Sequence, residues 1–443
     1  MEITGTTTML KPLYSAPHPL AGEKVPLTVF DRAALDIFIP IMFAYSAPAP
    51  SNEALKEGLR RAVAPYPHLA GRLLVDGQGR RLLHLNNEGV LVIEATIPYN
   101  LADVLVDGAM AANVCDLYPA TPEENFGVAL LQIKLNRYKC GGLVIGLSYH
   151  HHTADGVSMS NFITTWENAV REGEDFIAPT PFLDRAATAV PRRTPASVFD
   201  HRSIEFKNGG SSGCTSEGRD LIPTARIKDL RVHFTAEFVA ELKARVGGRC
   251  STFQCLLAHV WKKITAVRGL QPHEFTQVRV AVDCRGRANP PVPMDFFGNM
   301  VLWAFPRLRA RDVLSWSYQS VVGAIRDAVA RIDEEYIQSF VDFGTLADAS
   351  GEELVATAAA GTALCPDAEV DSWMGLRCHL LNFGTGPPSV VQLPYLPIEG
   401  LMVFVPSPTA KGGVDLFMGV AEDQMEAFKK ICYSFDDLLA ARM

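Results

Sequence analysis

The stretch that decides the fold is Leu143-Val144-Ile145-Gly146-Leu147-Ser148-Tyr149, followed directly by His150-His151-His152-Thr153-Ala154-Asp155-Gly156. The first seven residues are mostly apolar and predict a strand. The apolar residues that follow Asp155 recur at helical spacing and predict a helix: Phe162, Ile163, Trp166, Ala169 and Val170. The three histidines therefore stand at a strand-to-helix junction.

His151 is the candidate general base of this junction. The unperturbed pKa of histidine, about 6.5, lets a ring nitrogen accept a proton at cellular pH. The small residues Thr153, Ala154 and Gly156 let other backbone segments approach the turn closely. Asp155 can fix the turn by ion pairing or by capping the following helix.

Three consecutive histidines can also form a surface cluster or an accidental metal site. A metal site needs further ligands at suitable spacing, and none stands out nearby, so we expect no bound metal. If the strand geometry persists, His150 and His152 point away from His151 and act as packing residues. The short His-x-x-x-Asp string also occurs by chance in long proteins and proves little by itself.

Outward from this junction, helices and strands mix without a regular alternation. We expect strands at Arg81–Leu85, Val90–Ala95, Val128–Leu135, Arg279–Val282, Leu380–Phe383 and Leu401–Val405. We expect helices at Ser51–Ala64, Ala236–Val246, Thr252–Val267, Val313–Glu334 and Asp423–Cys432. Residues 136–142 predict a hairpin turn that pairs Val128–Leu135 with Leu143–Tyr149. This pattern favours α/β layers with mixed sheets over a Rossmann fold or a barrel.

The chain has 443 residues, which at roughly 150 residues per domain suggests two large domains or three small ones. Residues 172–224 are poor in pattern and include Asn208-Gly209-Gly210-Ser211-Ser212-Gly213, as a long linker does. We therefore expect one domain at residues 1–177, a crossover linker at 178–224 and a second domain at 225–443.

Composition excludes several classes of protein. The formal net charge of −8 argues against a nucleic-acid partner. The nine cysteines are scattered and form no Cys-x-x-Cys pair, which indicates reduced thiols rather than a disulfide framework or a structural zinc. No signal-peptide core and no long apolar run occurs. We expect a cytoplasmic monomer without a membrane partner.

Five strings stand together in the order and spacing of one family. They are Tyr66-Pro67-His68-Leu69-Ala70-Gly71-Arg72-Leu73, His151-x-x-x-Asp155-Gly156, Asp283-Cys284-Arg285-Gly286-Arg287, Phe297-Gly298-Asn299 and Asn382-Phe383-Gly384-Thr385-Gly386. On these strings the chain resembles the plant BAHD acyltransferases over essentially its whole length.

The resemblance implies two domains of the chloramphenicol acetyltransferase type, joined by a crossover loop. It implies a tunnel between them that admits acyl-CoA from one face and the acceptor from the other, with no cofactor besides the acyl-CoA co-substrate. It also implies that His151 deprotonates the acceptor, which attacks the thioester directly without an acyl-enzyme. Asp155 is then structural and paired with Arg285.

The last string departs from the family's Asp-Phe-Gly-Trp-Gly pattern at two positions. Asn382 stands where an aspartate is usual, and it can keep a neutral hydrogen bond of roughly half the strength. We expect Asn382 and Gly384 to support the site in a slightly looser loop. Thr385 stands where a tryptophan is usual, so the tunnel widens there or loses a polar contact near the thioester oxygen.

The segment Arg249-Cys250-Ser251-Thr252 precedes a predicted helix and is a candidate CoA contact. A helix N-terminus with hydroxyl groups and an arginine suits a phosphate, although an ordinary helix cap has the same sequence. The family resemblance favours CoA binding at Ser251 and Thr252.

The candidate acceptor segment is Glu369-Val370-Asp371-Ser372-Trp373. Relatives that acylate shikimate or quinate have a threonine at the position of Asp371 and an arginine near Ala358. This reversal of charge disfavours an acidic acceptor and favours a cationic one. If the segment is extended, Glu369 and Asp371 point to the same side and can hold a distal cation.

The string also resembles the grass N-hydroxycinnamoyltransferases that use agmatine or putrescine. We therefore expect transfer of a hydroxycinnamoyl group from CoA to an aliphatic polyamine. Further candidates for the acceptor end are Thr385, Trp373, Asp36 and Phe38. The alternatives are an arylamine such as tryptamine or tyramine, an O-acyltransferase, a catalytically silent binding member of the fold, and a merely solvated acidic edge.

Overall fold

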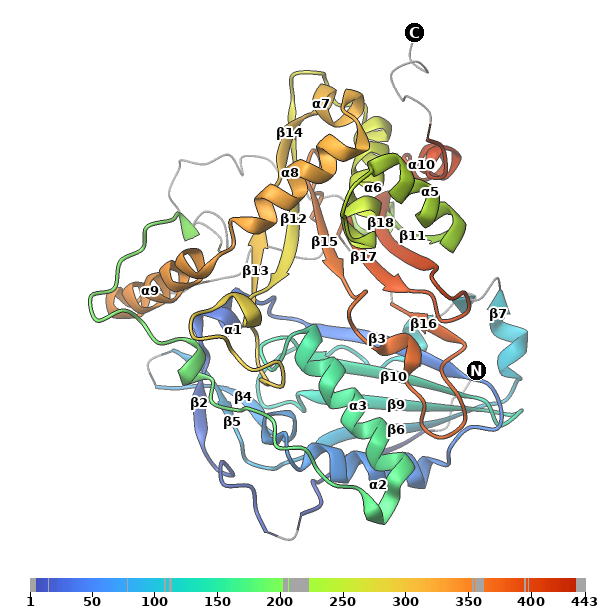
Figure 1. Ribbon diagram of the computed structural model, residues 1–443. Helices are drawn as coiled ribbons and strands as arrows, with labels where there is room; N and C mark the ends of the chain where they lie inside the picture. Colours follow the sequence, from blue (N-terminus) through green and yellow to red (C-terminus); the bar gives the residue numbers. More distant parts are fainter. Residues whose placement is uncertain are drawn as a thin grey trace.

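The computed structural model describes residues 5–435 apart from positions 15, 78, 107–108, 111–113, 202–205, 207–222, 353, 355–361, 394–395 and 397. The glycine-rich string at 208–213 and Ala358 lie outside the described residues. Two large mixed sheets with helices packed on them form the lower and upper halves of the view in Figure 1. Within the described part of the chain, no helix is long and apolar enough to cross a membrane.

The first sheet has six strands in the order β1-β6-β9-β10-β3-β16. They are β1 (Gly5–Leu10), β6 (Val90–Ile97), β9 (Leu131–Tyr138), β10 (Leu143–His150), β3 (Phe38–Tyr45) and β16 (Val390–Gln392). The sheet is mixed, because β6 and β9 pair in parallel and the other neighbours pair antiparallel. Smaller pieces flank it, namely β2 (Lys24–Pro26), β4 (Arg72–Val75), β5 (Arg81–His84), β7 (Leu105–Val106) and β8 (Ala109–Met110).

The second sheet has seven strands in the order β11-β18-β17-β15-β12-β13, with β14 also on β12. They are β11 (Ile227–Phe234), β18 (Val414–Ala421), β17 (Leu401–Pro406), β15 (Ala368–Ser372), β12 (Phe275–Asp283), β13 (Val301–Ala304) and β14 (Arg307–Arg309). Strand β15 pairs in parallel with both β12 and β17, so this sheet is mixed as well.

Helices cover these sheets and bury their apolar faces. Those of the first half are α1 (Val29–Ala33), α2 (Asn52–Val63) and α3 (Gly156–Glu172). Those of the second half are α5 (Ala236–Val246), α6 (Thr252–Arg268), α7 (Ala310–Ser315), α8 (Tyr318–Ala330), α9 (Glu334–Ser350) and α10 (Met425–Ile431). Each half has its own large apolar core.

Many predicted elements are present with bounds close to the expected ones. Strands β9 and β10 form the predicted antiparallel pair, with Leu143 opposite Arg137, although β9 runs on to Tyr138 and shortens the turn. Helix α5 has the predicted bounds, and α3 begins at Gly156 as the spacing indicated. The fold class, α/β with mixed sheets, is confirmed by the topology.

Two predicted elements are wrong. The helix expected at Val313–Glu334 is three helices, because Ser317 caps α8 and Asp333 caps α9, and each cap starts a new helix axis. The strand expected at Leu380–Phe383 is a short 3₁₀ turn, Cys378–Leu380, followed by irregular chain. Leu381 and Phe383 face the core without sheet pairing, while Leu380 is exposed, which a short apolar run does not reveal.

One strand crosses between the two halves of the sequence. Strand β16 lies late in the chain, yet Val390 to Gln392 pair with Ala44 to Met42 of β3 and complete the first sheet. The residues just before β16 join the same core, where Phe383 packs on Tyr45 and Trp166. A division of the chain at residues 178–224 therefore does not divide the sheets.

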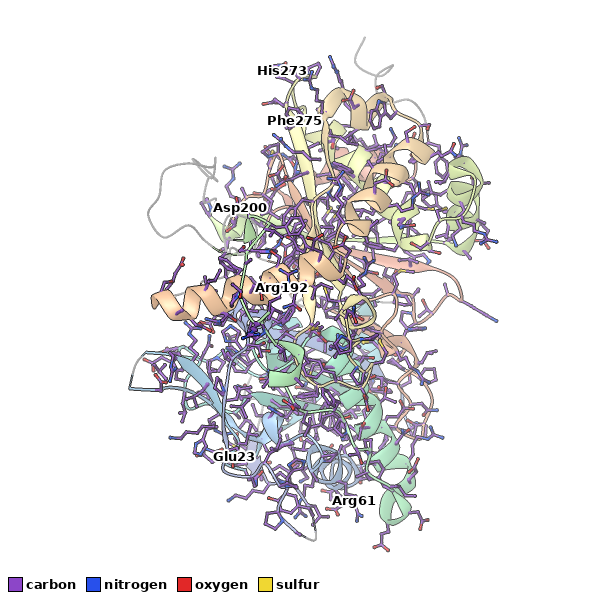
Figure 2. The ribbon with its side chains drawn as sticks, turned by 60° about the vertical axis from the view of Figure 1, so that its left-hand side comes forward. Glu23, Arg61, Arg192, Asp200, His273 and Phe275 are labelled. Carbon is purple, nitrogen blue, oxygen red and sulfur yellow. The ribbon has the colours of Figure 1, made fainter. Side chains whose placement is uncertain are left out.

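The described residues of the crossover segment form hydrogen bonds and an ion pair with helix α9. Arg192 lies beside helix α9, as Figure 2 shows, and its guanidinium and backbone N–H both bond the buried carboxylate of Asp342. Further on, His201 bonds Ser339 of the same helix at 3.0 Å. The described part of this segment is thus fastened to the second half of the chain.

Helices α2 and α3 approach closely at Gly58, where a Cβ would stand 2.4 Å from Val170 Cγ2 and 2.9 Å from its backbone nitrogen. Gly58→Ala must therefore push the helices apart, and we expect a loss of about 1–3 kcal/mol in the free energy of unfolding. Urea denaturation measures it. The control is Gly323→Ala in α8, where a Cβ meets nothing within 4 Å. Alanine there is a better helix former, so an equal loss in both variants contradicts the packing argument.

Candidate active site

The turn after β10 is fixed by a buried ion pair between Asp155 and Arg285. Asp155 is the N-cap of α3 and accepts the backbone N–H of Ser158 at 3.0 Å and of Met300 at 2.9 Å. The Arg285 guanidinium donates to the same carboxylate at 2.9 Å, and both side chains are almost fully buried. The carboxylate is therefore occupied by backbone and by Arg285, the contact that the family resemblance implied.

His151 contacts Asn299 instead of Asp155. Its Nδ1 lies 3.2 Å from Asn299 Oδ1, while Asn299 Nδ2 donates to the His151 carbonyl at 2.9 Å and to Asp31 Oδ1 at 2.9 Å. Because the amide nitrogen has two acceptors, the amide oxygen must face the ring and accept a proton from Nδ1. The neutral ring then carries its proton on Nδ1, which leaves the lone pair on Nε2.

A second buried ion pair holds Asn299 in this orientation. Arg185, from the crossover segment, donates to Asp31 Oδ1 at 2.7 Å and to the carbonyls of His152 and Thr153. The side chains of Asp31 and Arg185 are each 1% exposed. Burial lowers the pKa of His151 below its ordinary value, and its backbone and Asp155 oppose that shift only in part. His151 is therefore a neutral hydrogen-bond acceptor at neutral pH.

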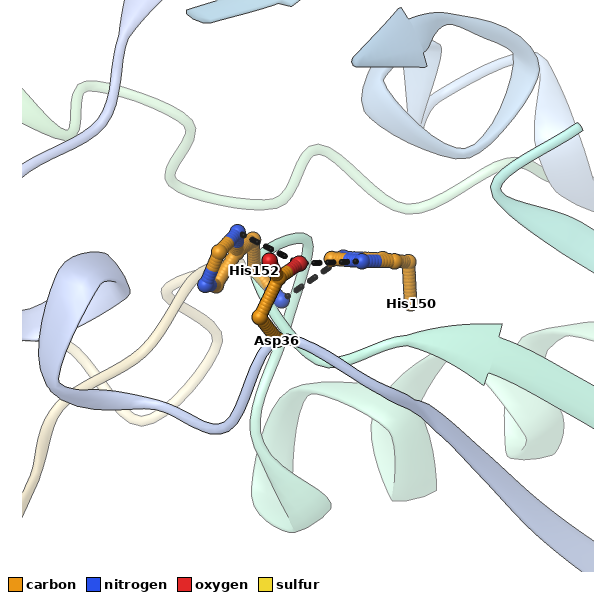
Figure 3. A group of neighbouring side chains, drawn as sticks. All are labelled: Asp36, His150 and His152. Carbon is orange, nitrogen blue, oxygen red and sulfur yellow. Dashed lines mark hydrogen bonds and ion pairs between the residues drawn. The ribbon is translucent and has the colours of Figure 1, made fainter. Parts of the chain in front are cut away.

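His150 and His152 lie together beside Asp36 (Figure 3), with their ring centroids 4.9 Å apart. His150 Nε2 is 3.2 Å and His152 Nδ1 is 3.9 Å from Asp36 Oδ1. Arg81 and Asn125 also bond this carboxylate, and Phe38 packs edge-on against the His150 ring. Asp36 and Phe38, predicted at the acceptor end, are therefore engaged with His150.

The expected absence of a third metal ligand beside the histidines is wrong, because Asp36 brings an oxygen within metal-site distance of both rings. The hydrogen bonding nevertheless favours a proton over a metal ion. His150 Nδ1 accepts the His152 N–H at 3.3 Å, so the neutral ring must carry its proton on Nε2, toward Asp36. Burial would raise the pKa of Asp36, but His150, His152 and Arg81 hold it well below its usual range. An absent metal stays a prediction.

The two predicted acceptor carboxylates are not equivalent. Strand β15 is extended as supposed, but Glu369 is buried and paired with Arg279 at 3.3 Å, and Arg279 stacks on Trp303. The carboxylate of Asp371 shows no hydrogen bond or ion pair among the described residues, and burial raises its pKa to about 7, with Glu369 adding to the shift. Its charge in turn contributes to the raised pKa of Tyr149, whose ring centroid lies 6.4 Å from that of His151.

The loop at residues 382–386 is organised by Asn382. Its Oδ1 accepts the backbone N–H groups of Gly384 at 2.9 Å and Gly386 at 2.8 Å, both with positive φ. The neutral hydrogen bond expected of asparagine is thus present twice. Thr385 is exposed at the tip of this loop, whereas Trp373 is half-buried and donates its backbone N–H to Phe404.

The predicted CoA residues lie at the start of α6. Ser251 Oγ accepts the Gln254 N–H, and Gln254 returns a bond to the Ser251 N–H, each at 3.1 Å. This reciprocal capping box accounts for the sequence there, while Ser251 is exposed and Thr252 half-buried. CoA binding at these residues stays a prediction.

Sequence reasoning missed three residues of the site. Asn299 belonged to a quoted motif, but nothing in the string shows that its amide faces His151. Asp31 and Arg185 lie more than a hundred residues apart and gave no local signal, because an ion pair between distant segments has no sequence spacing.

Two mixed α/β halves that meet at this site define a two-domain acyltransferase of the chloramphenicol acetyltransferase type. Vinorine synthase has this fold, with a TM-score of 0.70 at 21% identity over 96% of both chains. TRI101 of F. sporotrichioides, in complex with coenzyme A and T-2, gives a TM-score of 0.64 at 18% identity over 92% of this chain and 97% of that chain.

Residues 4–434 match the model of the Transferase family, and the chain belongs to this family, that of the plant BAHD acyltransferases. Tryptamine benzoyltransferase 1 of Oryza sativa subsp. japonica is 63% identical over 99% of this chain and 98% of its own. Tryptamine hydroxycinnamoyltransferase 2 of the same plant is 57% identical over 98% and 99%. Its agmatine hydroxycinnamoyltransferase 1 is 37% identical over 99% and 100%.

The contact between His151 and Asn299 predicts opposite effects of two substitutions on the pKa of His151. Asn299→Asp places a carboxylate beside Nδ1, favours the imidazolium and raises the pKa by about one unit or more. Asn299→Ala removes the acceptor, so the pKa falls further. Titration of ¹⁵N-labelled histidine by NMR measures both values, and shifts of the same sign contradict the contact.

Proposed function

We propose that this enzyme transfers an aromatic acyl group, benzoyl or hydroxycinnamoyl, from CoA to the primary amine of an arylalkylamine of the tryptamine class. The relatives at 57% and 63% identity are named for tryptamine, whereas the relative named for agmatine is 37% identical. The comparisons thus favour the arylamine alternative over the polyamine that the sequence first suggested.

The observation that carries the choice of acceptor is the neutralisation of Glu369 by Arg279. Agmatine and putrescine keep a second cation far from the reacting nitrogen, and the pair of carboxylates was expected to hold it. With Glu369 paired, Asp371 is the carboxylate of β15 that we propose for a ligand cation. One free carboxylate suits the single ammonium of a monoamine better than the two cations of agmatine or putrescine.

In the proposed reaction His151 is the general base. The amine nitrogen attacks the thioester carbonyl carbon, and Nε2 of His151 takes the N–H proton as the tetrahedral intermediate forms. The C–S bond then breaks, and the imidazolium returns the proton to the CoA sulfur. Asn299 keeps Nδ1 protonated throughout, while Asp155 and Arg285 hold the turn and do not touch the substrates.

The alkylammonium must lose a proton before it attacks, since its pKa is about 10 and only a small fraction is neutral at pH 7. The carboxylate binds the ammonium, whose first proton passes to solvent before the attack, so that Nε2 of the neutral imidazole stays free to take the second N–H proton. The complete His151–Asn299 contact also argues against a silent binding member of the fold. A cytoplasmic monomer, with donor binding at Ser251 and Thr252, remains part of this proposal.

A panel of amines with benzoyl-CoA and coumaroyl-CoA tests the reaction. The release of the CoA thiol reports the rate. We expect kcat/KM for tryptamine or tyramine to exceed that for putrescine and agmatine. His151→Ala should lower kcat by about 10²- to 10⁴-fold, the usual contribution of a general base. Preference for a diamine, or for an alcohol, overturns the proposed acceptor.

Asp371→Asn tests the ammonium site. Loss of a charged contact worth about 1.5–3 kcal/mol should weaken amine binding by roughly 10- to 100-fold and leave acyl-CoA binding unchanged. Because the free carboxyl titrates near pH 7, amine affinity in the parent enzyme should rise from pH 6 to pH 8, and this rise should vanish in the variant. Calorimetric titration at each pH measures it.

The control is Asp423→Asn, which removes an exposed carboxylate outside β15 and should change neither affinity. Stability without ligand gives a second readout. The pKa of Asp371 is raised on folding, so its ionisation destabilises the folded state as the pH rises above the unfolded value. Asp371→Asn should therefore raise Tm at pH 8 and leave it unchanged at pH 4.

A further inference from the structure

The thiols of Cys250 and Cys255 face each other at the start of α6. Their sulfur atoms are 3.0 Å apart, about 1 Å more than the S–S bond of roughly 2.05 Å in a disulfide. Cys255 is fully buried, whereas Cys250 is partly exposed to solvent. The pair therefore has one sulfur that a reagent can reach and a second that lies against it.

The two residues occupy the positions of a hydrophobic staple, one before the N-cap Ser251 and the other in the first turn of the helix. Packing alone asks only for two apolar side chains there. Two thiols in contact add a chemistry that apolar side chains lack, because a covalent bond can replace the packing contact.

We propose that Cys250 and Cys255 are a reversible modification site, which a low-molecular-weight disulfide such as oxidised glutathione converts to an intramolecular disulfide. The Cys250 thiolate attacks one glutathione sulfur, the glutathione S–S bond breaks, and a glutathione thiolate leaves. Cys255 then loses its proton and attacks Cys250 Sγ, which releases the second glutathione. Two protein thiols are oxidised, one glutathione disulfide is reduced, and the two protons end on the two glutathione thiols.

The order of the steps follows from burial. Burial raises the pKa of the Cys255 thiol to about 12, with Cys250 adding to the shift, so Cys255 is a poor first nucleophile. Once Cys250 carries the mixed disulfide, contact between the two sulfurs gives the second attack a high effective concentration that offsets the low thiolate fraction.

The bond closes a loop around the start of α6, the region that we propose for CoA. The capping residues Ser251 and Gln254 lie within that loop, and Phe253 packs on Phe404 of β17, next to the acceptor strand β15. Oxidation should therefore shift the exposed N–H groups of this turn and weaken donor binding. This part of the inference rests on the proposed function, whereas the disulfide itself does not.

The sequence makes the test direct, because Arg249 and Lys262 bound a tryptic peptide, residues 250–262, that contains these two cysteines and no other. After treatment with oxidised glutathione and then an alkylating reagent, we expect this peptide unalkylated and lighter by two hydrogens. Dithiothreitol should restore two alkylation sites. A peptide that carries two alkyl groups after oxidation overturns the proposal.

Kinetics distinguish regulation from mere oxidation. We expect a several-fold rise in KM for acyl-CoA that dithiothreitol reverses, with an unchanged KM for the amine. Cys250→Ser keeps the size of the side chain, and its KM for acyl-CoA should be the same before and after oxidised glutathione, while Cys140→Ser, at an exposed cysteine elsewhere, should respond like the parent. A disulfide with unchanged KM, or sensitivity that persists in Cys250→Ser, overturns the regulatory role. An enzyme that acylates no amine refutes the proposed function and leaves the peptide result standing.

Discussion

The buried pair of Asp155 and Arg285 is the interaction on which the rest of the site depends. Arg285 comes from the second half of the chain and reaches the N-cap of a helix in the first half. Its guanidinium also bonds Ser158 Oγ, while that hydroxyl receives the Gly298 N–H. A charge taken out of water at this depth is tolerable only with full partners, and here the partners come from three segments, at residues 155–158, 283–285 and 296–300. The turn with His151 is therefore held by the fold of both halves.

The charged residues around His151 have different partners because of this ion pair. Asp155 is fully engaged, so the ring of His151 is oriented by an amide, Asn299, that adds no charge. Burial lowers the pKa of His151, and a neutral partner opposes this shift less than a carboxylate would, which suits the general base that we propose. The negative charge of Asp31 contacts Asn299 and is balanced by Arg185.

The sequence predicted those parts of the structure that have local causes. The strand Leu143–Tyr149, the helix after Asp155 and the helix Ala236–Val246 follow from apolar spacing and capping residues, and the structure has all three. Strand β16 was missed because three residues give no pattern, and strand β3 because its apolar run resembles many others. The helix at 313–334 failed because apolar periodicity continued through two breaks.

The site shows the same limit. His151 was found because its neighbours in sequence are its neighbours in space, at the end of one strand. Asn299, Asp31 and Arg185 meet only in the folded chain. Glu369 and Asp371 looked alike on paper, since alternation put both on one side, but Arg279 on the adjacent strand β12 neutralises one of them. Counting both carboxylates along one strand therefore overestimated the negative charge that is free to bind a cation.

The short strand β16 also limits which segments can be exchanged between related enzymes. Because it completes the first sheet from far along the chain, the unit that could be transplanted into a relative is not a continuous half of the sequence. A hybrid joined within the crossover segment would put β3 of one parent beside β16 of the other, and Tyr45 beside a foreign Phe383. Recombination that respects the fold must carry the segment from Cys378 to Gln392 along with the first half.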